Sequence, residues 1–177
     1  MFLTSLLLLA LVAVSTAMSS SSNLRHRLHA KKASITQIST FLATHNLERA
    51  FHGAQPLTWS SSLASKAEEW AKNCEFRHTD GVLSDTPYGE NIVATTGDYS
   101  VDGALQSFLG TRSGYSSQNP TYNQWTQVVW KGTKELGCAV SSCNNIFDSK
   151  DGPASMTVCL YSPVGNVVGE LQDNVQA

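Results

Sequence analysis

Two titratable side chains, His78 and Glu90, stand out as residues that could carry chemistry in this chain. Both lie in residues 75–96, a turn-rich stretch with little hydrophobic periodicity. A histidine and a carboxylate that folding brings together can act as a general acid–base pair. The alternative is a structural role, because paired groups of this kind are often only structural. In that case Glu90 would tie down loop backbone and His78 would hydrogen-bond within the fold.

Other catalytic motifs do not occur in the sequence. The serines at 60–62 and 116–117 are not in a nucleophile-elbow context, and there is no glycine-rich phosphate loop. No Cys-x-x-Cys spacing occurs, so a zinc cluster is not expected. Two further histidines are expected to be structural and not to bind a ligand. We expect His45 to be a core or interface residue and His52 to be exposed beside a glycine.

A second stretch of interest, residues 115–125, has three aromatic side chains and no regular period. It predicts a shaped loop, and such loops often carry binding groups. The alternative is that its aromatic side chains only pack the loop onto the body of the protein. Residues 126–130 are β-branched and aromatic and too few for a helix, so they predict a buried central strand.

Helices are expected first among the elements that position these residues. Ser34 and Gln37 form a capping box, and apolar residues then recur at helical spacing, so a helix should follow and end near Gly53. A second helix is expected over residues 63–74, with one apolar face. Ser100 is expected to cap a third helix.

Strands are expected late in the chain, at residues 136–140 and 156–161, and each of these carries one cysteine. Helices followed by clustered strands predict an α+β fold, with helices packed on a mostly antiparallel sheet. An even number of cysteines behind a secretory leader argues for two disulfides, and three pairings are possible. The cysteines are Cys74, Cys138, Cys143 and Cys159.

The start of the chain predicts export from the cell. Residues 2–14 are apolar and Ser15-Thr-Ala17 offers small residues for cleavage, so residues 1–17 read as a secretory signal peptide. The apolar run is too short to span a bilayer, although a retained anchor is the alternative. We therefore expect a secreted, extracellular protein without stable membrane insertion.

Charge is unevenly distributed along the chain. Residues 25–32 hold four basic residues and no acid, and residues 18–33 are predicted to be a flexible basic leader. The rest of the chain holds eight Lys and Arg against fourteen Asp and Glu. Such an acidic domain favours neither nucleic acid nor anionic lipid. Residues 34–172 are expected to form the domain and residues 173–177 a tail, with fraying after Glu170.

Four blocks of sequence, in order and with compatible gaps, resemble the CAP superfamily of cysteine-rich secretory proteins, antigen 5 and pathogenesis-related protein 1. The blocks are His45-Asn46 with Arg49 and Pro56-Leu-Thr-Trp59; Asn73-Cys74 with His78 and Tyr88-Gly-Glu-Asn-Ile92; Trp125-Thr-Gln-Val-Val-Trp130 with Leu136-Gly-Cys138; and Cys159-Leu-Tyr161 with Pro163 and Gly165-Asn-Val-Val-Gly-Glu170. The resemblance covers roughly residues 35–170. The layout looks most like fungal or plant pathogenesis-related members.

The resemblance implies a three-layer α-β-α sandwich, which agrees with the α+β fold expected from the residues. It also implies a particular disulfide pattern, Cys74 with Cys143 and Cys138 with Cys159. Each bridge would stabilise the fold by about 2–4 kcal/mol by constraining the unfolded chain.

The resemblance further implies a cleft that usually holds two histidines and two glutamates, which bind a divalent metal in some members. His78 and Glu90 fall on the first histidine and the first glutamate. Thr111 stands at the second glutamate and Gln124 at the second histidine. An amide oxygen is uncharged and suits zinc poorly. We therefore predict no bound metal, no cofactor and no enzymatic activity.

Fungal and plant members are associated with sterol binding through the aromatic loop, so the resemblance implies a sterol or a related small hydrophobic ligand. A flat ligand would suit aromatic walls. The loop residues concerned are Tyr115, Asn119, Pro120, Tyr122 and Trp125. One alternative is a metal-dependent hydrolase or protease using His78 and Glu90. The other is a secreted protein with a degenerate cleft that engages an extracellular protein partner.

Overall fold

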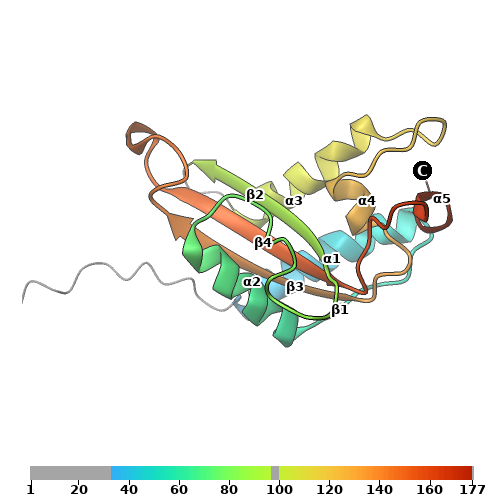
Figure 1. Cartoon of the computed structure of the whole chain (residues 1–177), viewed down its shortest axis with the longest axis horizontal. Coiled ribbons are helices and arrows are strands. Elements are labelled where there is room, and N and C mark those ends of the chain that lie inside the picture. The colour runs from blue at the N-terminus through green and yellow to red at the C-terminus, as the bar shows by residue number, and fades with distance from the viewer. Residues whose placement is uncertain (1–32, 97–99, 177) are drawn as a thin grey trace, which may run out of the picture.

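The computed structural model describes residues 33–96 and 100–176, so the predicted signal peptide and nearly all of the basic leader lie outside the described residues. Figure 1 shows helices lying on a long twisted sheet. The helices are α1 (Ile35–Phe51), α2 (Ser61–Asn73), α3 (Val101–Gly110), α4 (Gln124–Val128) and α5 (Leu171–Asn174), with short 3-10 helices at Thr111–Gly114 and Ser149–Asp151. The strands are β1 (Thr58–Trp59), β2 (Gly89–Thr96), β3 (Glu135–Cys143) and β4 (Ala154–Ser162).

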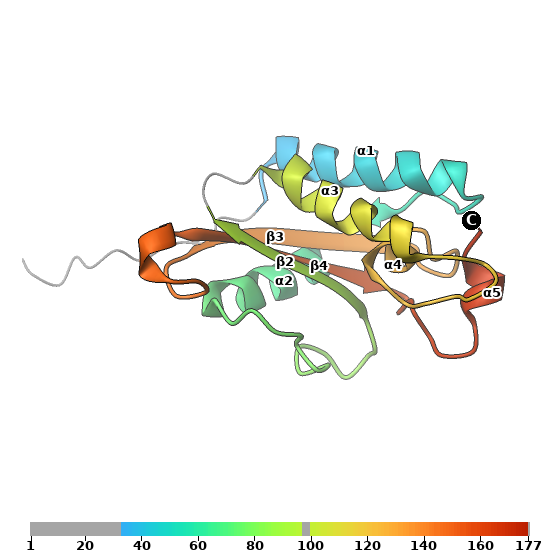
Figure 2. The same ribbon diagram turned by 90° about the horizontal axis from the view of Figure 1, so that it is seen from above.

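The sheet has the strand order β1-β3-β4-β2. Strand β4 pairs antiparallel with β2 on one side and with β3 on the other, and the two-residue strand β1 adds a short parallel pair to β3. Figure 2 shows α1 and α3 side by side on one face of the sheet and α2 on the other. The predicted α+β fold, a three-layer α-β-α sandwich on a mostly antiparallel sheet, is confirmed.

Local signals in the sequence explain where α1 and α3 begin. The Ser34 hydroxyl accepts a hydrogen bond from the Gln37 N–H, and the Gln37 side chain accepts one from the Ser34 N–H, which completes the predicted capping box. The Ser100 hydroxyl accepts from the Gly103 N–H at the start of α3. These side chains satisfy backbone donors that a helix start leaves without partners.

Strand β4 is buried along most of its length because helices cover both faces of the sheet. Its side chains alternate between two hydrophobic clusters. Cys159 and Tyr161 pack with α1 and α3, whereas Val158 and Leu160 pack with α2. The strand therefore separates two cores.

Both disulfides implied by the family resemblance are present. Cys74, directly after α2, is joined to Cys143 at the end of β3. Cys138 and Cys159 face each other across the β3–β4 ladder and are bonded there. One bridge therefore ties a helix to the sheet and the other ties two strands together.

Gly137 sets the spacing between α2 and β3. A Cβ atom at this position would lie 2.2 Å from the backbone nitrogen of Ala64 and 2.6 Å from the carbonyl carbon of Leu63. Backbone atoms at that distance cannot move aside cheaply. The N-terminal part of α2 therefore packs directly on the strand, with room for only a hydrogen atom.

Two predictions about the second half of the chain are wrong. Residues 126–130 do not form a strand, because most of them belong to α4, whose start is capped reciprocally by Asn123 and Thr126. The chain also does not fray after Glu170. Leu171 begins α5, and both Leu171 and Val175 are buried in the core on the α1 side of the sheet.

Candidate functional site

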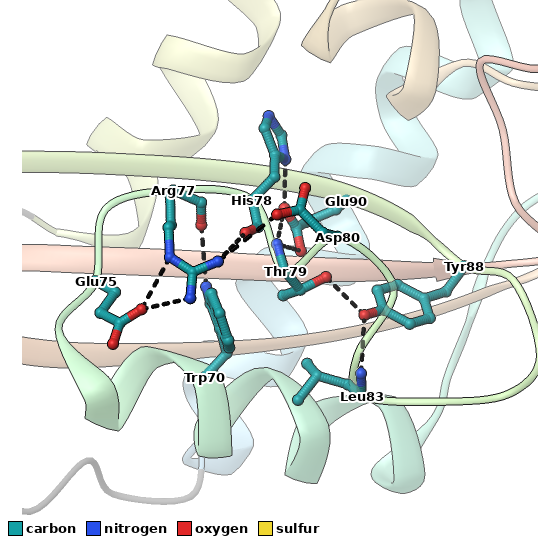
Figure 3. Close-up of polar contacts among 9 residues, drawn as sticks. All are labelled: Trp70, Glu75, Arg77, His78, Thr79, Asp80, Leu83, Tyr88 and Glu90. Atoms are coloured by element: carbon teal, nitrogen blue, oxygen red, sulfur yellow. Dashed lines mark hydrogen bonds and ion pairs between the residues drawn. The ribbon is translucent and has the colours of Figure 1, made fainter.

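Folding brings His78 and Glu90 together. His78 lies in the loop after α2 and Glu90 lies near the start of β2, and the imidazole Nδ1 is paired with a Glu90 carboxylate oxygen (Figure 3). The His78 side chain is 71% exposed, whereas the Glu90 side chain is only 8% exposed. The pair therefore combines a buried carboxylate with an imidazole that solvent can reach.

Glu90 also holds the loop backbone. Its two carboxylate oxygens accept from the Thr79 N–H at 3.3 and 3.2 Å. Nearby, the hydroxyls of Thr79 and Tyr88 hydrogen-bond at 2.6 Å, and the Leu83 N–H donates to the Tyr88 hydroxyl at 3.3 Å. Figure 3 shows these contacts as one network between the loop and the sheet. The carboxylate is thus engaged in positioning backbone as well as in pairing with His78.

The other two positions of the expected four-residue cleft do not join this pair. The Gln124 side chain donates to the carbonyl of Ile92, farther along β2 than Glu90, at 2.8 Å. The Thr111 hydroxyl donates to the Phe108 carbonyl at 2.8 Å and accepts from the Trp125 N–H at 2.9 Å. Gln124 therefore lies against β2, whereas Thr111 fastens the end of α3 to the start of α4.

The residues at these positions do not fit a metal ion. Within residues 33–96 and 100–176, no three His, Cys, Asp or Glu side chains gather in a way that could hold one. The groups at 111 and 124 are neutral and are already committed to hydrogen bonds. His78 and Glu90 alone provide fewer protein ligands than a zinc site requires.

Behind Glu90 lies a buried polar network that connects α1 to the sheet. The Asn91 side chain donates to the Tyr161 hydroxyl at 3.0 Å and to the Gln124 carbonyl at 3.0 Å. The Tyr161 hydroxyl is 2.9 Å from Nε2 of His45, whose Nδ1 is 2.8 Å from the Phe41 carbonyl. Because a carbonyl only accepts, Nδ1 of His45 carries the proton and the tyrosine hydroxyl donates to Nε2.

Burial keeps this network neutral. It lowers the pKa of His45 to about 4, although the hydrogen bond to the Phe41 carbonyl opposes the shift. It also raises the pKa of the Tyr161 hydroxyl. The prediction that His45 is a core residue is confirmed, because its side chain is completely buried.

Arg49 is a buried cation that contacts carbonyl groups. Its guanidinium donates to the carbonyls of Gln55, Val128, Trp130 and Thr133 at 2.7–2.9 Å. Burial lowers its pKa to about 10. The carbonyls of Val128, Trp130 and Thr133 lie at the end of α4 and in the turn that leads to β3. Arg49, which belongs to α1, therefore holds this turn against α1.

Trp125 does not form an open wall for a ligand, because it is completely buried. Its indole N–H donates to Glu48 at 2.7 Å, and its ring packs edge-on against His52 and beside Tyr115, with centroid distances of 5.0 and 5.1 Å. The prediction that His52 is exposed is wrong. It is buried under the C-terminal segment, where its Nδ1 lies 2.6 Å from the Gln176 carbonyl.

Tyr122 is the aromatic side chain of the loop that faces solvent, with 41% of the residue exposed. Its hydroxyl donates to the Val167 carbonyl at 3.1 Å and accepts from the Gly169 N–H at 2.8 Å. Asn119 closes a turn with Ser116 and is exposed, and Pro120 is half-buried. The loop thus presents one fixed tyrosine ring beside the turn at residues 167–169.

Sequence reasoning singled out His78, Glu90 and Tyr122 but missed the roles of Arg49, Asn91 and Tyr161. Polar residues within otherwise apolar segments were the available signal. Asn91 adjoins Glu90, and Tyr161 ends the apolar run of β4. Their partners lie far along the chain, so spacing alone could not name them.

A model of the CAP family, described as the cysteine-rich secretory protein family, matches residues 42–161. The chain belongs to the CAP family. The matched range contains both disulfides, the His78–Glu90 pair and the His45, Asn91 and Tyr161 side chains of the buried network, so these features lie within the CAP domain.

Relatives of this CAP domain include pathogenesis-related proteins of fungi and plants. It is 36% identical over 143 residues to "Probable pathogenesis-related protein" of Arthroderma benhamiae, a match that covers 75% of this chain and 46% of that one. It is 33% identical over 138 residues to "Pathogenesis-related protein 1" of Arabidopsis thaliana, covering 73% of this chain and 78% of the relative. The chain thus spans less than half the length of the Arthroderma relative.

Solved structures share the fold. The structure of BmVAL-1 matches with a TM-score of 0.63 at 23% identity, covering 77% of this chain and 81% of that one. Over the part of the chain that is described here, no helix is both long and apolar enough to cross a bilayer.

Proposed function

We propose that this chain is an exported CAP domain that binds sterols or related small hydrophobic ligands at a surface formed by the loop of residues 115–125 and the turn at 167–169. We call this the Tyr122 surface. Two disulfides support export, because such bonds persist in oxidising compartments. The likeness to fungal and plant pathogenesis-related proteins supports a role outside the cell.

The observation that carries the proposal is the exposed but anchored ring of Tyr122. Two hydrogen bonds to the 167–169 turn fix its hydroxyl, so the ring is held on the surface. Val168, within the same turn, is strongly exposed and adds aliphatic surface. A flat apolar ligand gains about 25 cal/mol for each Å² of apolar area that it buries against such groups. Because the ring is already fixed, little side-chain entropy is lost on binding.

The test is saturable binding of a fluorescent sterol to the purified, oxidised chain. Tyr122→Ala removes the ring and is expected to weaken binding about ten-fold or more, with the native fold retained because the residue is partly exposed. Phe51→Ala is the matched control, since Phe51 is an exposed aromatic residue on α1 that lies outside the Tyr122 surface. Trp125→Ala is unsuitable as a binding probe, because removing a buried tryptophan costs about 3–5 kcal/mol of stability.

Absence of saturable sterol binding by the folded wild-type protein would refute the proposal. Equal loss of binding in Tyr122→Ala and Phe51→Ala would also refute it, because the effect would then not depend on the Tyr122 surface.

We propose that the His78–Glu90 pair is not catalytic and that Glu90 alone has a structural role, in positioning the loop backbone. Glu90 holds the Thr79 N–H, and the groups at 111 and 124 supply neither a charge nor a metal ligand to the pair. Hydrolysis of peptide or ester substrates that depends on added zinc, and that is lost in His78→Ala, would argue for the hydrolase alternative.

An extracellular protein partner is a second candidate, and the outer face of α1 supports it. Leu47 and Phe51, one helical turn apart, are both strongly exposed, and exposed apolar side chains often mark contact surfaces. Capture of one partner from secreted extracts by the wild-type chain, but not by a Leu47→Ser/Phe51→Ser variant, would support this function.

A further inference from the structure

A hollow of about 190 Å³ lies beside the His78–Glu90 pair. Its lining comes from Phe76, Arg77, His78 and Ile92. Ile92 is a buried residue of β2, whereas Phe76 is 52% exposed. The hollow therefore combines apolar surface from Phe76 and Ile92 with an accessible imidazole.

The aromatic side of the hollow is held in place by a disulfide. Phe76 follows Cys74 closely in sequence, and Phe147 follows Cys143, to which Cys74 is bonded. The rings of Phe76 and Phe147 lie in contact with centroids 6.5 Å apart, and both are partly exposed. Two loops that each carry an exposed phenylalanine are thus fixed side by side, which lowers the entropy lost when a ligand binds.

Arg77 is a half-exposed cation that is already paired with acids. Its guanidinium stacks 4.7 Å from the centroid of Trp70 and contacts Glu75 at 2.7 and 2.9 Å. A carboxylate oxygen of Asp80 lies 3.7 Å away on the other side. Figure 3 shows the guanidinium lying between Glu75, Trp70 and Asp80. Because nearby acids already neutralise its charge, the hollow favours an uncharged ligand over an anion.

His78 offers one hydrogen-bonding atom to a ligand. Its Nδ1 faces the Glu90 carboxylate and therefore carries a proton. Its Nε2 has no partner among the described residues, and Figure 3 shows this nitrogen turned away from Glu90. In the neutral ring Nε2 is an acceptor, so it suits an O–H donor.

We propose that this hollow binds a small uncharged alcohol or phenol with a single aromatic ring. The ligand's ring packs against Phe76 and Ile92, and its hydroxyl donates to Nε2 of His78. Size supports this class: a dry cavity of about 150 Å³ holds benzene, so a hollow of this volume suits one ring and not the four fused rings of a sterol. The site is separate from the Tyr122 surface and does not depend on the function proposed there.

The probe is benzyl alcohol, titrated into the full secreted chain with both disulfides formed and ¹⁵N label incorporated. Saturable chemical-shift changes are expected at the amides of residues 76–78 and 92, with a Kd on the order of 1 mM for so small a ligand. Toluene, which has the ring but no hydroxyl, is expected to bind several-fold more weakly, because Nε2 of His78 would then lack its donor.

Variants separate the two contacts. Phe76→Ala is expected to weaken binding of both probes about ten-fold, since it removes the aromatic wall. His78→Ala is expected to lower the affinity for benzyl alcohol to that for toluene and so to abolish the discrimination between them. Both residues are exposed, and an unchanged amide spectrum elsewhere verifies that each variant is folded. Tyr122→Ala and Phe51→Ala are controls in which benzyl alcohol should bind as in the wild type.

Four outcomes would overturn the inference. The first is no saturable change at residues 76–78 and 92, and the second is unchanged binding in Phe76→Ala. The third is equal affinity for toluene and benzyl alcohol in the wild-type protein. Loss of benzyl alcohol binding in Tyr122→Ala would place the ligand at the other surface and would also refute the proposal.

Discussion

His45 and His78 show how differently one residue type is used on the two sides of this protein. His45 lies in α1, completely buried, with both ring nitrogens engaged by Phe41 and Tyr161. His78 lies in the loop after α2, mostly exposed, with one nitrogen engaged by Glu90. The first histidine belongs to a satisfied internal network, whereas the second keeps a nitrogen available to solvent or to a ligand.

Burial, more than residue type, therefore decides what polar side chains do in this CAP domain. Buried groups on the α1 side connect distant segments and should strongly affect stability when removed. Exposed groups on the loop after α2 should affect stability little, which leaves them available for binding.

Arg49→Met should lower the free energy of unfolding by about 4 kcal/mol, because it leaves several buried carbonyls without their charged donor. Urea unfolding measures the change. Arg112→Met is the matched control, since this exposed guanidinium only stacks 5.7 Å from the Trp125 ring and should contribute less than about 1 kcal/mol. Equal effects of the two substitutions would break the contrast between buried and exposed groups.

Acid should destabilise the protein through His45. Burial lowers its pKa to about 4, against 6.5 in the unfolded chain. Between these values the unfolded chain takes up a proton that the folded protein does not, so stability falls as pH decreases from 6.5 to 4 and is unaffected by this group above 6.5. Over this pH range the free energy of unfolding should fall by roughly 3 kcal/mol because of His45.

The pH effect of His45 is isolated by comparison with His45→Gln, because carboxylates also titrate in this range. Unfolding free energies of both proteins, measured from pH 7 to pH 4, should converge as the pH falls. Parallel curves would show that His45 does not contribute.

Glu90→Ala should lower the free energy of unfolding by about 1–2 kcal/mol, since the Thr79 N–H loses its acceptor within a buried part of the loop. Hydrogen exchange gives a local readout, in which the Thr79 amide should lose protection. Glu90→Gln keeps an acceptor oxygen and should restore most of that protection. Unchanged exchange at Thr79 in Glu90→Ala would contradict a role for the carboxylate in holding the loop.

His78→Ala should change the free energy of unfolding by less than about 0.5 kcal/mol, because the imidazole is mostly exposed. Thermal unfolding of the variant and of the wild type, measured side by side, gives this change. A loss comparable to that of Arg49→Met would mean that His78 is a structural residue, and the distinction between the two sides of the protein would fail.

Local signals predicted the fold well. The caps at Ser34 and Ser100 and the apolar faces of the helices located α1, α2 and α3, because these features depend on residues within a few positions of one another. Residues 126–130 read wrongly as a strand because a short apolar run does not distinguish a strand from one buried helical turn. The reciprocal cap of Asn123 and Thr126 was the local signal that favoured α4.

The sites were less predictable because their partners are remote in sequence. His52 is buried by the segment that ends at Gln176, and Arg49 reaches carbonyls from residue 128 onward. The His78–Glu90 pairing could be anticipated from the family resemblance, but the partial exposure of Phe76 and Phe147 and their mutual contact could not. Tertiary folding alone brings such residues together.

The position of α2 depends on the absence of a side chain at Gly137. The glycine lies under the beginning of the helix, whereas the end of the helix is covalently anchored through Cys74. A side chain at residue 137 would push the beginning of the helix away from β3, against the hydrogen bond of the Ser60 N–H to the Leu136 carbonyl, while the disulfide holds the other end. The helix would then tilt and shift the segment that carries Phe76, so a substitution buried beneath the helix would reshape a hollow that it never touches.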